Sequence, residues 1–209
     1  MVASRRVFLA ALGSTALFPA FGWADTGAAA VTAPVSALNQ ALIAIMKAGD
    51  STPFVKRFQM LAPVVDQVFD LPRILRFSVG AYWSTVPAAQ QQKLQQVFRS
   101  FIVATYVANF HSYNGEVSSV SPTTRAVGAQ QVVTSSLAKP SGEALRIDYV
   151  MGQAGGRWKI QDILLDGTIS RVAVQRSDFA SLLSDGNASR LIASLEQKVS
   201  TLSSGAISS

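Results

Sequence analysis

The chain has 209 residues, 49% of them hydrophobic, and a formal net charge of +6 at pH 7. It contains no cysteine and one histidine, which excludes disulfides, thiolate metal sites and any site that needs two imidazoles. The basic residues are scattered along the chain and form no stripe, so we do not expect nucleic-acid binding. The length suits one domain.

Residues 1–24 have the organisation of a bacterial export signal. Arg5 and Arg6 precede an apolar stretch over 7–21, and small residues surround an expected cleavage point at Ala24. The arginine pair resembles a twin-arginine signal, and an ordinary Sec signal is the alternative. Cleavage would remove 2 of the 18 basic residues and none of the 12 acidic ones, leaving +4 and a periplasmic product. No later apolar run is expected to span a bilayer.

Helical periodicity dominates the first half of the chain. Residues 25–33 are small and uninformative, and a flexible lead-in is expected there. From 34 to 49 the apolar residues recur three or four apart, which predicts a helix. Two more helices are expected over 53–69 and 70–80, and a long one over 87–113.

After residue 115 the apolar residues recur at every second position instead of three or four apart. Four strands joined by short turns are predicted over 116–121, 125–138, 143–152 and 156–165. One face of each later strand is apolar, so helices must cover that face of the sheet. Two helices over about 170–184 and 188–202 follow, with a flexible tail over 203–209. The predicted class is therefore α+β, in which a helical layer packs on a curved antiparallel sheet in a single domain over 34–202.

Catalytic groupings are scarce. His111 lies at a helix end, where a structural imidazole is expected. Asp148, Asp162 and Asp166 lie nearest the apolar strand positions, where a desolvated carboxylate could serve as a general base. The alternative is that these carboxylates cap the next helix or pair with arginines. No catalytic residue, metal or cofactor is expected.

Large apolar side chains, several with polar tips, fall on the inward faces of the predicted elements. A solid core explains any single one of them, but together they could line an apolar pocket between the helices and the sheet. The candidate lipid-binding residues are Trp83, Phe98, Phe101, Ile102, Tyr106, Val133, Ile147, Tyr149, Trp158 and Ile160.

Three stretches of the helical half, 70–76, 80–83 and 98–102, together with Tyr106, resemble the toluene-tolerance family of periplasmic lipid carriers, the MlaC type. The closing pattern of that family is Gly-x-Trp-Lys-Ile/Val, then an Asp, a Gly-containing turn and Arg-x-x-Phe. It is matched by Gly156, Trp158, Lys159, Ile160, Asp162, Gly167, Arg176 and Phe179. The resemblance covers nearly the whole chain after residue 24.

One departure points to a branch of that family. Ser170 stands one residue later than the serine of the usual Gly-Val-Ser-Leu, and with 109–116 this version is similar to the hopanoid-associated branch, HpnM. The resemblance implies a nuclear-transport-factor-2-like fold that holds acyl chains between its helices and its sheet.

The same resemblance implies a monomeric shuttle for phospholipid or hopanoid, without catalysis. Its partners would be an inner-membrane ABC transporter complex of the MCE type or a hopanoid exporter, with transient contact to the membrane surface. The alternative function is an Asp/Tyr acid–base enzyme, an isomerase or hydrolase, acting on a small apolar or polycyclic substrate.

Overall fold

The structure, a computed structural model, describes residues 24–165 and 167–207. Within them the chain first forms helices, then a sheet, then helices again. The first helices are α1 (Ala24–Ala48), α2 (Phe54–Val68), α3 (Leu71–Val79), the 3-10 helix η1 (Gly80–Ser84) and α4 (Ala88–Asn109). The strands are β1 (Val117–Val127), β2 (Gln130–Ala138), β3 (Ala144–Ala154), β4 (Arg157–Leu165) and β5 (Ile169–Ser170), and the last helices are α5 (Arg171–Ala180) and α6 (Ser189–Leu202).

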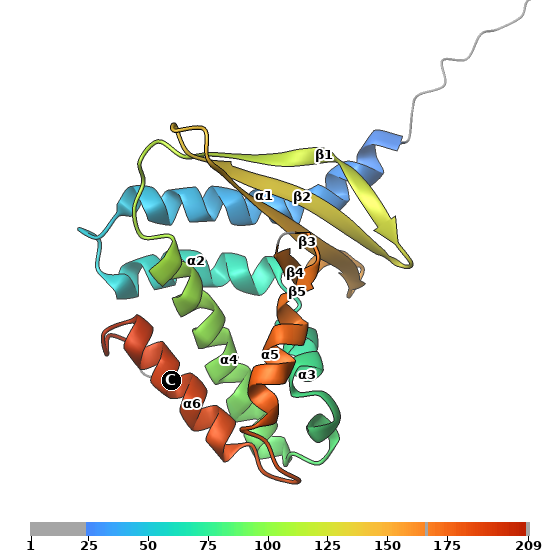
Figure 1. Cartoon of the computed structure of the whole chain (residues 1–209), viewed down its shortest axis with the longest axis vertical. Helices are drawn as coiled ribbons and strands as arrows, with labels where there is room; N and C mark the ends of the chain where they lie inside the picture. Colours follow the sequence, from blue (N-terminus) through green and yellow to red (C-terminus); the bar gives the residue numbers. More distant parts are fainter. Residues whose placement is uncertain (1–23, 166, 208–209) are drawn as a thin grey trace, which may run out of the picture.

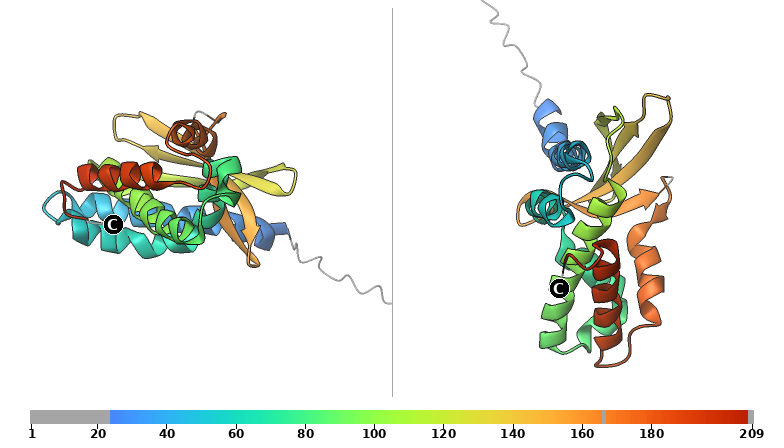
Figure 2. Two further views of the ribbon diagram at one scale, coloured as in Figure 1. Left: turned by 90° about the horizontal axis from the view of Figure 1, so that it is seen from below. Right: turned by 90° about the vertical axis from the view of Figure 1, so that its left-hand side faces the viewer.

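The five strands form one antiparallel meander in the order β1-β2-β3-β4-β5. Val133, Tyr149 and Ile163 are directly opposite one another on the three central strands, so they share one face of the sheet. The register shifts in β1 between Val120 and Thr124 and again at Val150. Such irregularities bend a sheet, and Figure 2 shows the resulting curvature. The predicted α+β class with a curved antiparallel sheet is confirmed.

The register shift at Val150 lies opposite Gln161, an extra residue of β4. Its amide accepts a hydrogen bond from Gln130 Nε2 at 3.1 Å and donates one to Asp70 Oδ2 at 3.2 Å. The Gln161 side chain crosses Gly152, where a Cβ would lie 2.0 Å from Gln161 Oε1. A side chain at this position would displace the Gln161 amide from its two partners, and the bulge ties β4 to the start of α3.

Two groups of helices pack on the sheet (Figure 1). Helix α1 crosses the sheet beside α2, and buried Asn39 of α1 donates to Ser135 Oγ of β2 at 2.8 Å. In the lower half of Figure 1, α4 packs on α6, and α3 packs on α5. The apolar core joins both groups to the sheet, with Leu38, Leu94 and Leu195 fully buried.

In the structure, residues 25–33, where a flexible lead-in was predicted, form the first turns of α1. Its alanines favour a helix, and Val31 and Val35 are 5% and 0% exposed within the core. Pro34, which the sequence pattern placed at the helix start, lies inside the helix instead. Tertiary burial of the two valines thus extends the helix beyond the proline.

Residues Gly27–Ala48 of α1 are long and apolar enough to cross a membrane by length and composition, in contrast to the expectation from sequence. Of the apolar window, 39% is buried inside the fold. The sheet and α2 both contact this helix, and a core helix of a soluble protein meets the same criterion. The buried apolar side chains of this helix therefore have partners within the domain.

The remaining boundaries differ in smaller ways. Helix α4 ends at Asn109 because Phe110 leaves helical geometry, four residues before the predicted end. The turn between the first two strands lies at Gly128, so residues 125–127 belong to β1. The first part of the predicted tail closes α6, since Ser203 is 3% exposed and its hydroxyl accepts from Ile207 N at 3.0 Å. The predicted export signal, apart from Ala24, lies outside the described residues.

Candidate functional site

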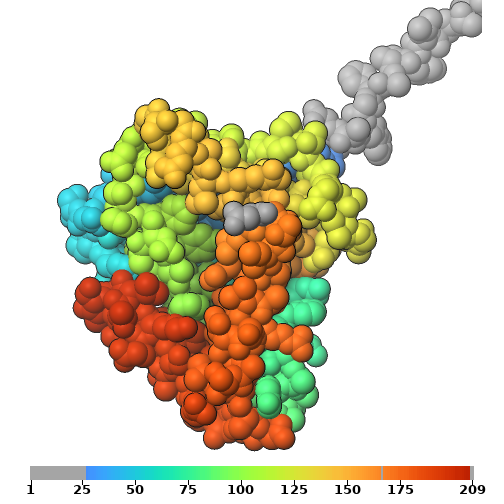
Figure 3. All heavy atoms as spheres, in the orientation of Figure 1, coloured from blue at the N-terminus to red at the C-terminus, as the bar shows by residue number. Residues whose placement is uncertain are grey.

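A cavity of about 340 Å³ lies between the helices and the sheet. Its walls come from α3, α4, β3, β4 and α5, together with Phe69 at the end of α2. On the face shown in Figure 3, α4 (green) and α5 (orange) lie below the start of β3. The volume falls in the lower part of the range of about 300–1,000 Å³ that is typical of ligand pockets.

The lining is mainly apolar, with aromatic rings along α4. Tyr106 packs against Phe69 with ring centroids 5.9 Å apart and stacks on Phe110 at the same distance. Tyr106 and Phe110 are four residues apart, so both project from one side of the helix. Ile147 and Ile163 form the sheet side of the cavity. An apolar ligand would therefore meet rings on one side and branched aliphatic groups on the other.

Polar groups line the cavity chiefly where α5 begins. Asp162 Oδ1 accepts from Val172 N at 3.1 Å and from Ile163 N at 2.7 Å, and its Oδ2 accepts from Ser170 Oγ. Ser170 Oγ in turn accepts from Ala173 N at 2.9 Å. Asp162 and Ser170 together cap the N-terminus of α5, which is the structural alternative weighed for this carboxylate.

Asp148 is 3% exposed and does not line the cavity. Its carboxylate accepts from Thr134 Oγ1 at 2.7 Å and pairs with Arg146 at 3.2 Å. Those partners satisfy a buried charge that would otherwise be costly. Asp166, the third candidate base, lies outside the described residues. The two described candidates thus have structural partners in this fold.

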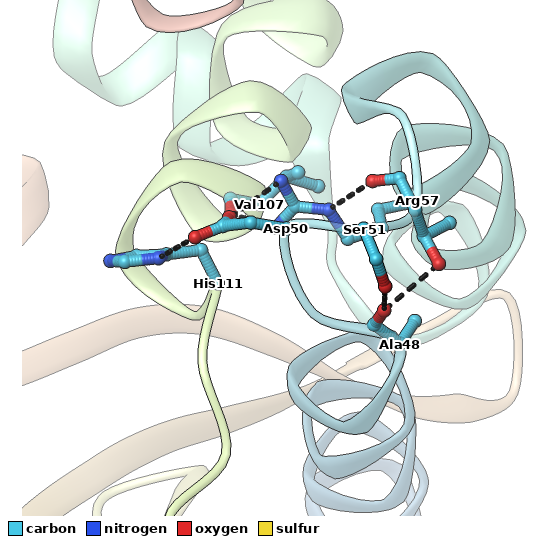
Figure 4. Close-up of polar contacts among 7 residues, drawn as sticks. Ala48, Asp50, Ser51, Arg57, Val107 and His111 are labelled. Carbon is cyan, nitrogen blue, oxygen red and sulfur yellow. Dashed lines mark hydrogen bonds and ion pairs between the residues drawn. The ribbon is translucent and has the colours of Figure 1, made fainter.

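His111 belongs to a polar cluster away from the cavity lining (Figure 4). Its Nδ1 lies 3.2 Å from Asp50 Oδ2, and its side chain is half exposed. Asp50 also pairs with Arg57, a 5% exposed arginine that donates to Thr52 O at 3.1 Å and Val107 O at 3.4 Å. These contacts tie the α1–α2 turn to the end of α4, which gives the histidine a structural setting.

Four of the ten candidate lipid-binding residues line the cavity: Phe101, Ile102, Tyr106 and Ile147. Val133, Tyr149 and Ile160 are fully buried in the core outside the lining. Phe98 borders a second hollow of about 300 Å³, which shares Phe69 and Leu71 with the first. Trp83 and Trp158 are partly buried against the core and line neither hollow.

Several lining residues were absent from the candidates. They come from the end of α2, from α3, from β4 and from the start of α5: Phe69, Leu71, Ile74, Ile163 and Val172. The apolar spacing of Leu71 and Ile74 on a short amphipathic helix was visible in the sequence. That this helix closes the cavity was not visible, because its position depends on the Phe69–Ile160 bridge that brings it to β4.

Two phenols lie at this end of the sheet, Tyr149 fully buried in the core and Tyr106 partly buried against it. Burial raises the pKa of Tyr149 and also that of Tyr106, whose pKa is raised further by Tyr149 and lowered somewhat by Arg171. The Tyr149 hydroxyl has no hydrogen-bond partner among the described residues. Because removal from water disfavours the charged phenolate, the raised pKa values keep both phenols neutral until strongly alkaline pH.

The fold and the cavity define an α+β protein that encloses an apolar, ligand-sized space between a curved sheet and a layer of helices. The family model of the MlaC protein matches residues 36–197, and the chain belongs to this family. The predicted family membership is therefore confirmed.

A solved structure supports the same fold. The phospholipid-binding protein from Ralstonia solanacearum, solved in complex with a phospholipid, matches with a TM-score of 0.67 at 24% identity. The match covers 82% of this chain and 98% of that chain. At this identity the likeness establishes the shared fold. No curated protein matches the chain.

Proposed function

We propose that the protein is a soluble periplasmic lipid carrier without catalytic activity. The observation that carries the proposal is the apolar cavity of about 340 Å³, with its aromatic side on α4, in a chain of the MlaC family. The structural partners of Asp148 and Asp162 favour a carrier over the acid–base enzyme. The export signal expected over 1–24 is the basis for the periplasm.

The energetics of an apolar cavity suit a carrier. Moving a lipid from a bilayer into such a cavity exchanges one apolar environment for another, so the hydrophobic contribution of about 0.8 kcal/mol per CH₂ largely cancels. The protein can then load and unload near equilibrium, but it cannot set the direction of transport. A partner must set it, and we propose an inner-membrane ABC transporter complex of the MCE type or a hopanoid exporter.

For the cargo we propose a membrane lipid with a large apolar body, a phospholipid or a hopanoid. The phospholipid in the similar Ralstonia solanacearum structure supports the first. Two positions of the hopanoid-branch pattern support the second: Asn109 lines the cavity, and Ser170 holds Asp162, which also lines it. Both cargoes need the same apolar space.

The test is mass spectrometry of the lipid extracted from protein purified from the periplasm. We expect a chemically unchanged membrane lipid, and Ile102→Asp to lose it while remaining folded, because an unpaired charge is not tolerated beside an apolar ligand. Ile147→Asn is a milder second variant, and Met60→Asp at an exposed position of α2 is the control, which should keep the lipid. Lipid-free wild type, or a chemically modified product, would contradict the carrier.

A further inference from the structure

One face of α3 is exposed within the part of the chain that the structure describes, and it combines cations with an aromatic ring. Arg73, Arg76 and Phe77 follow the spacing of one helical face and are all exposed, and Phe77 is 50% exposed. The Arg73 guanidinium lies 4.6 Å from the centre of the Phe77 ring. We call these three residues the α3 outer face. The opposite side of the helix, with Leu71 and Ile74, lines the cavity.

A third positive charge lies at the end of the α3 outer face. Arg176 of α5 reaches over Gly80, where a Cβ would lie 3.0 Å from the arginine Nε. Among the described residues, Arg73, Arg76 and Arg176 form no ion pair. These positive charges are therefore not neutralised by side chains of the described fold.

The carboxylates of the adjoining elements do not cancel this charge. Asp70 caps α3 by accepting from Arg73 N at 3.3 Å, and its other oxygen accepts from Gln161. Asp178 on α5 is two residues from Arg176, about 200° further round the helix. The α3 outer face thus presents a net positive surface around an exposed aromatic ring.

We infer that the α3 outer face docks the protein on the surface of an anionic lipid bilayer. Basic side chains attract anionic head groups, and an exposed phenylalanine can enter the boundary between head groups and acyl chains. A stable protein partner takes about 20–30 residues a side, whereas this face is one turn and a half of helix without a groove or a strand edge. The inference rests on the proposed function, because a lipid carrier must meet a bilayer.

Vesicle sedimentation of the purified full chain tests the inference. We expect binding to phosphatidylcholine vesicles that contain about 30% phosphatidylglycerol and none to phosphatidylcholine alone. Raising the salt from about 0.05 M to about 0.5 M should release the protein, because screening shortens the reach of exposed charges. Arg73→Gln with Arg76→Gln should weaken binding roughly 25-fold, at about fivefold for each arginine.

The matched control is Arg125→Gln with Arg157→Gln, which removes the same charge from exposed positions on the sheet. It should change binding less than about twofold, because those arginines lie outside the α3 outer face. Phe77→Ser alone should also weaken binding at low salt, because it removes the ring that enters the boundary between head groups and acyl chains.

Three outcomes overturn the inference: wild type that ignores anionic vesicles, an α3 double variant that binds like wild type, and a control that loses as much as the double variant. If the protein bound an acidic polypeptide but no vesicles, the inference would also be overturned, and the α3 outer face would be assigned to a protein partner. Mass spectrometry of the bound lipid on the same preparations separates failure of this surface from failure of the carrier function.

Discussion

The Tyr149 hydroxyl is buried on the sheet face that the helices cover and has no hydrogen-bond partner among the described residues. Leaving such a group unpaired costs about 1–3 kcal/mol, whereas an apolar group of the same shape costs nothing of this kind. Val133 and Ile163 flank it across the sheet, so the ring itself packs well. The phenol oxygen is therefore the unfavourable part of an otherwise favourable core residue.

Tyr149→Phe should keep or raise the free energy of unfolding at pH 7, by about 1 kcal/mol. The free energy of unfolding of this variant should also fall less than that of the wild type at alkaline pH. Burial raises the pKa of Tyr149 above its ordinary value of 10.0, so the folded state holds the proton after the unfolded state has lost it. The stability that this protonated phenol contributes is fully present below pH 10, and it is lost as the pH rises through the raised pKa.

Urea denaturation between about pH 7 and pH 11 measures both effects. The wild type should lose stability above about pH 10, and Tyr149→Phe should lose less, with Tyr106 responsible for the rest. Tyr113→Phe, at an exposed position, is the control and should follow the wild-type slope. A Tyr149→Phe protein that is clearly less stable at neutral pH would show that the hydroxyl has a partner, such as a buried water.

At the scale of the elements, α5 depends on its N-terminal cap. The helix has ten residues and buries only Gln175 and Phe179 along its length. An isolated helix this short is unstable in water, so its capping and packing decide whether it forms. Asp162 and Ser170 satisfy backbone donors at its start, and a negative charge there also suits the helix dipole.

Asp162→Ala should lower the free energy of unfolding by about 1–2 kcal/mol, because Val172 N loses its acceptor and the cap loses its charge. Urea denaturation gives the stability, and mass spectrometry gives the lipid content. Asp178→Ala at an exposed position of α5 is the control and should be nearly neutral. If Asp162→Ala were as stable as wild type and kept its lipid but lost function, the enzyme hypothesis would return.

At the scale of the whole molecule, the cavity depends on several separate elements staying apart. Helix α4, helix α5 and the ends of β3 and β4 converge on it, and Phe69 and Leu71 separate it from the neighbouring hollow. A flexible acyl chain can bend around an obstruction in such a space. A rigid polycyclic lipid cannot, so the two proposed cargoes respond differently to a change of shape.

Thr105→Trp narrows the cavity from the α4 side, because Thr105 is partly buried and lines it. We expect the variant to keep a diacyl phospholipid with reduced occupancy and to lose a hopanoid almost completely. Mass spectrometry after loading with an equal mixture of both lipids measures the ratio. Ala89→Trp at an exposed position of the same helix is the control and should leave the ratio unchanged. Equal loss of both lipids from a folded Thr105→Trp protein would mean that rigidity does not decide selection.

The sequence by itself determined the main helices, four of the five strands and their order, while β5 and η1 were not predicted. The change of apolar period after residue 115 separated helices from strands, and turns such as Gly155-Gly156 made the sheet an antiparallel meander. The reason is local: side-chain periodicity follows from backbone geometry, and short turns join only neighbouring strands. The family was also readable, because its closing pattern from Gly156 to Phe179 depends on residue identities rather than on contacts.

Only the tertiary structure decided which inward residues line the cavity. Tyr149 and Ile147 share a face of β3, yet Tyr149 is packed in the core and Ile147 borders the space. Periodicity tells which face a side chain takes, but not how far away the opposite surface lies. That distance depends on sheet curvature, on the bulge at Gln161 and on the placement of α3 and α5. For the same reason the start of α1 was missed, since burial of Val31 against distant residues extended the helix through Pro34.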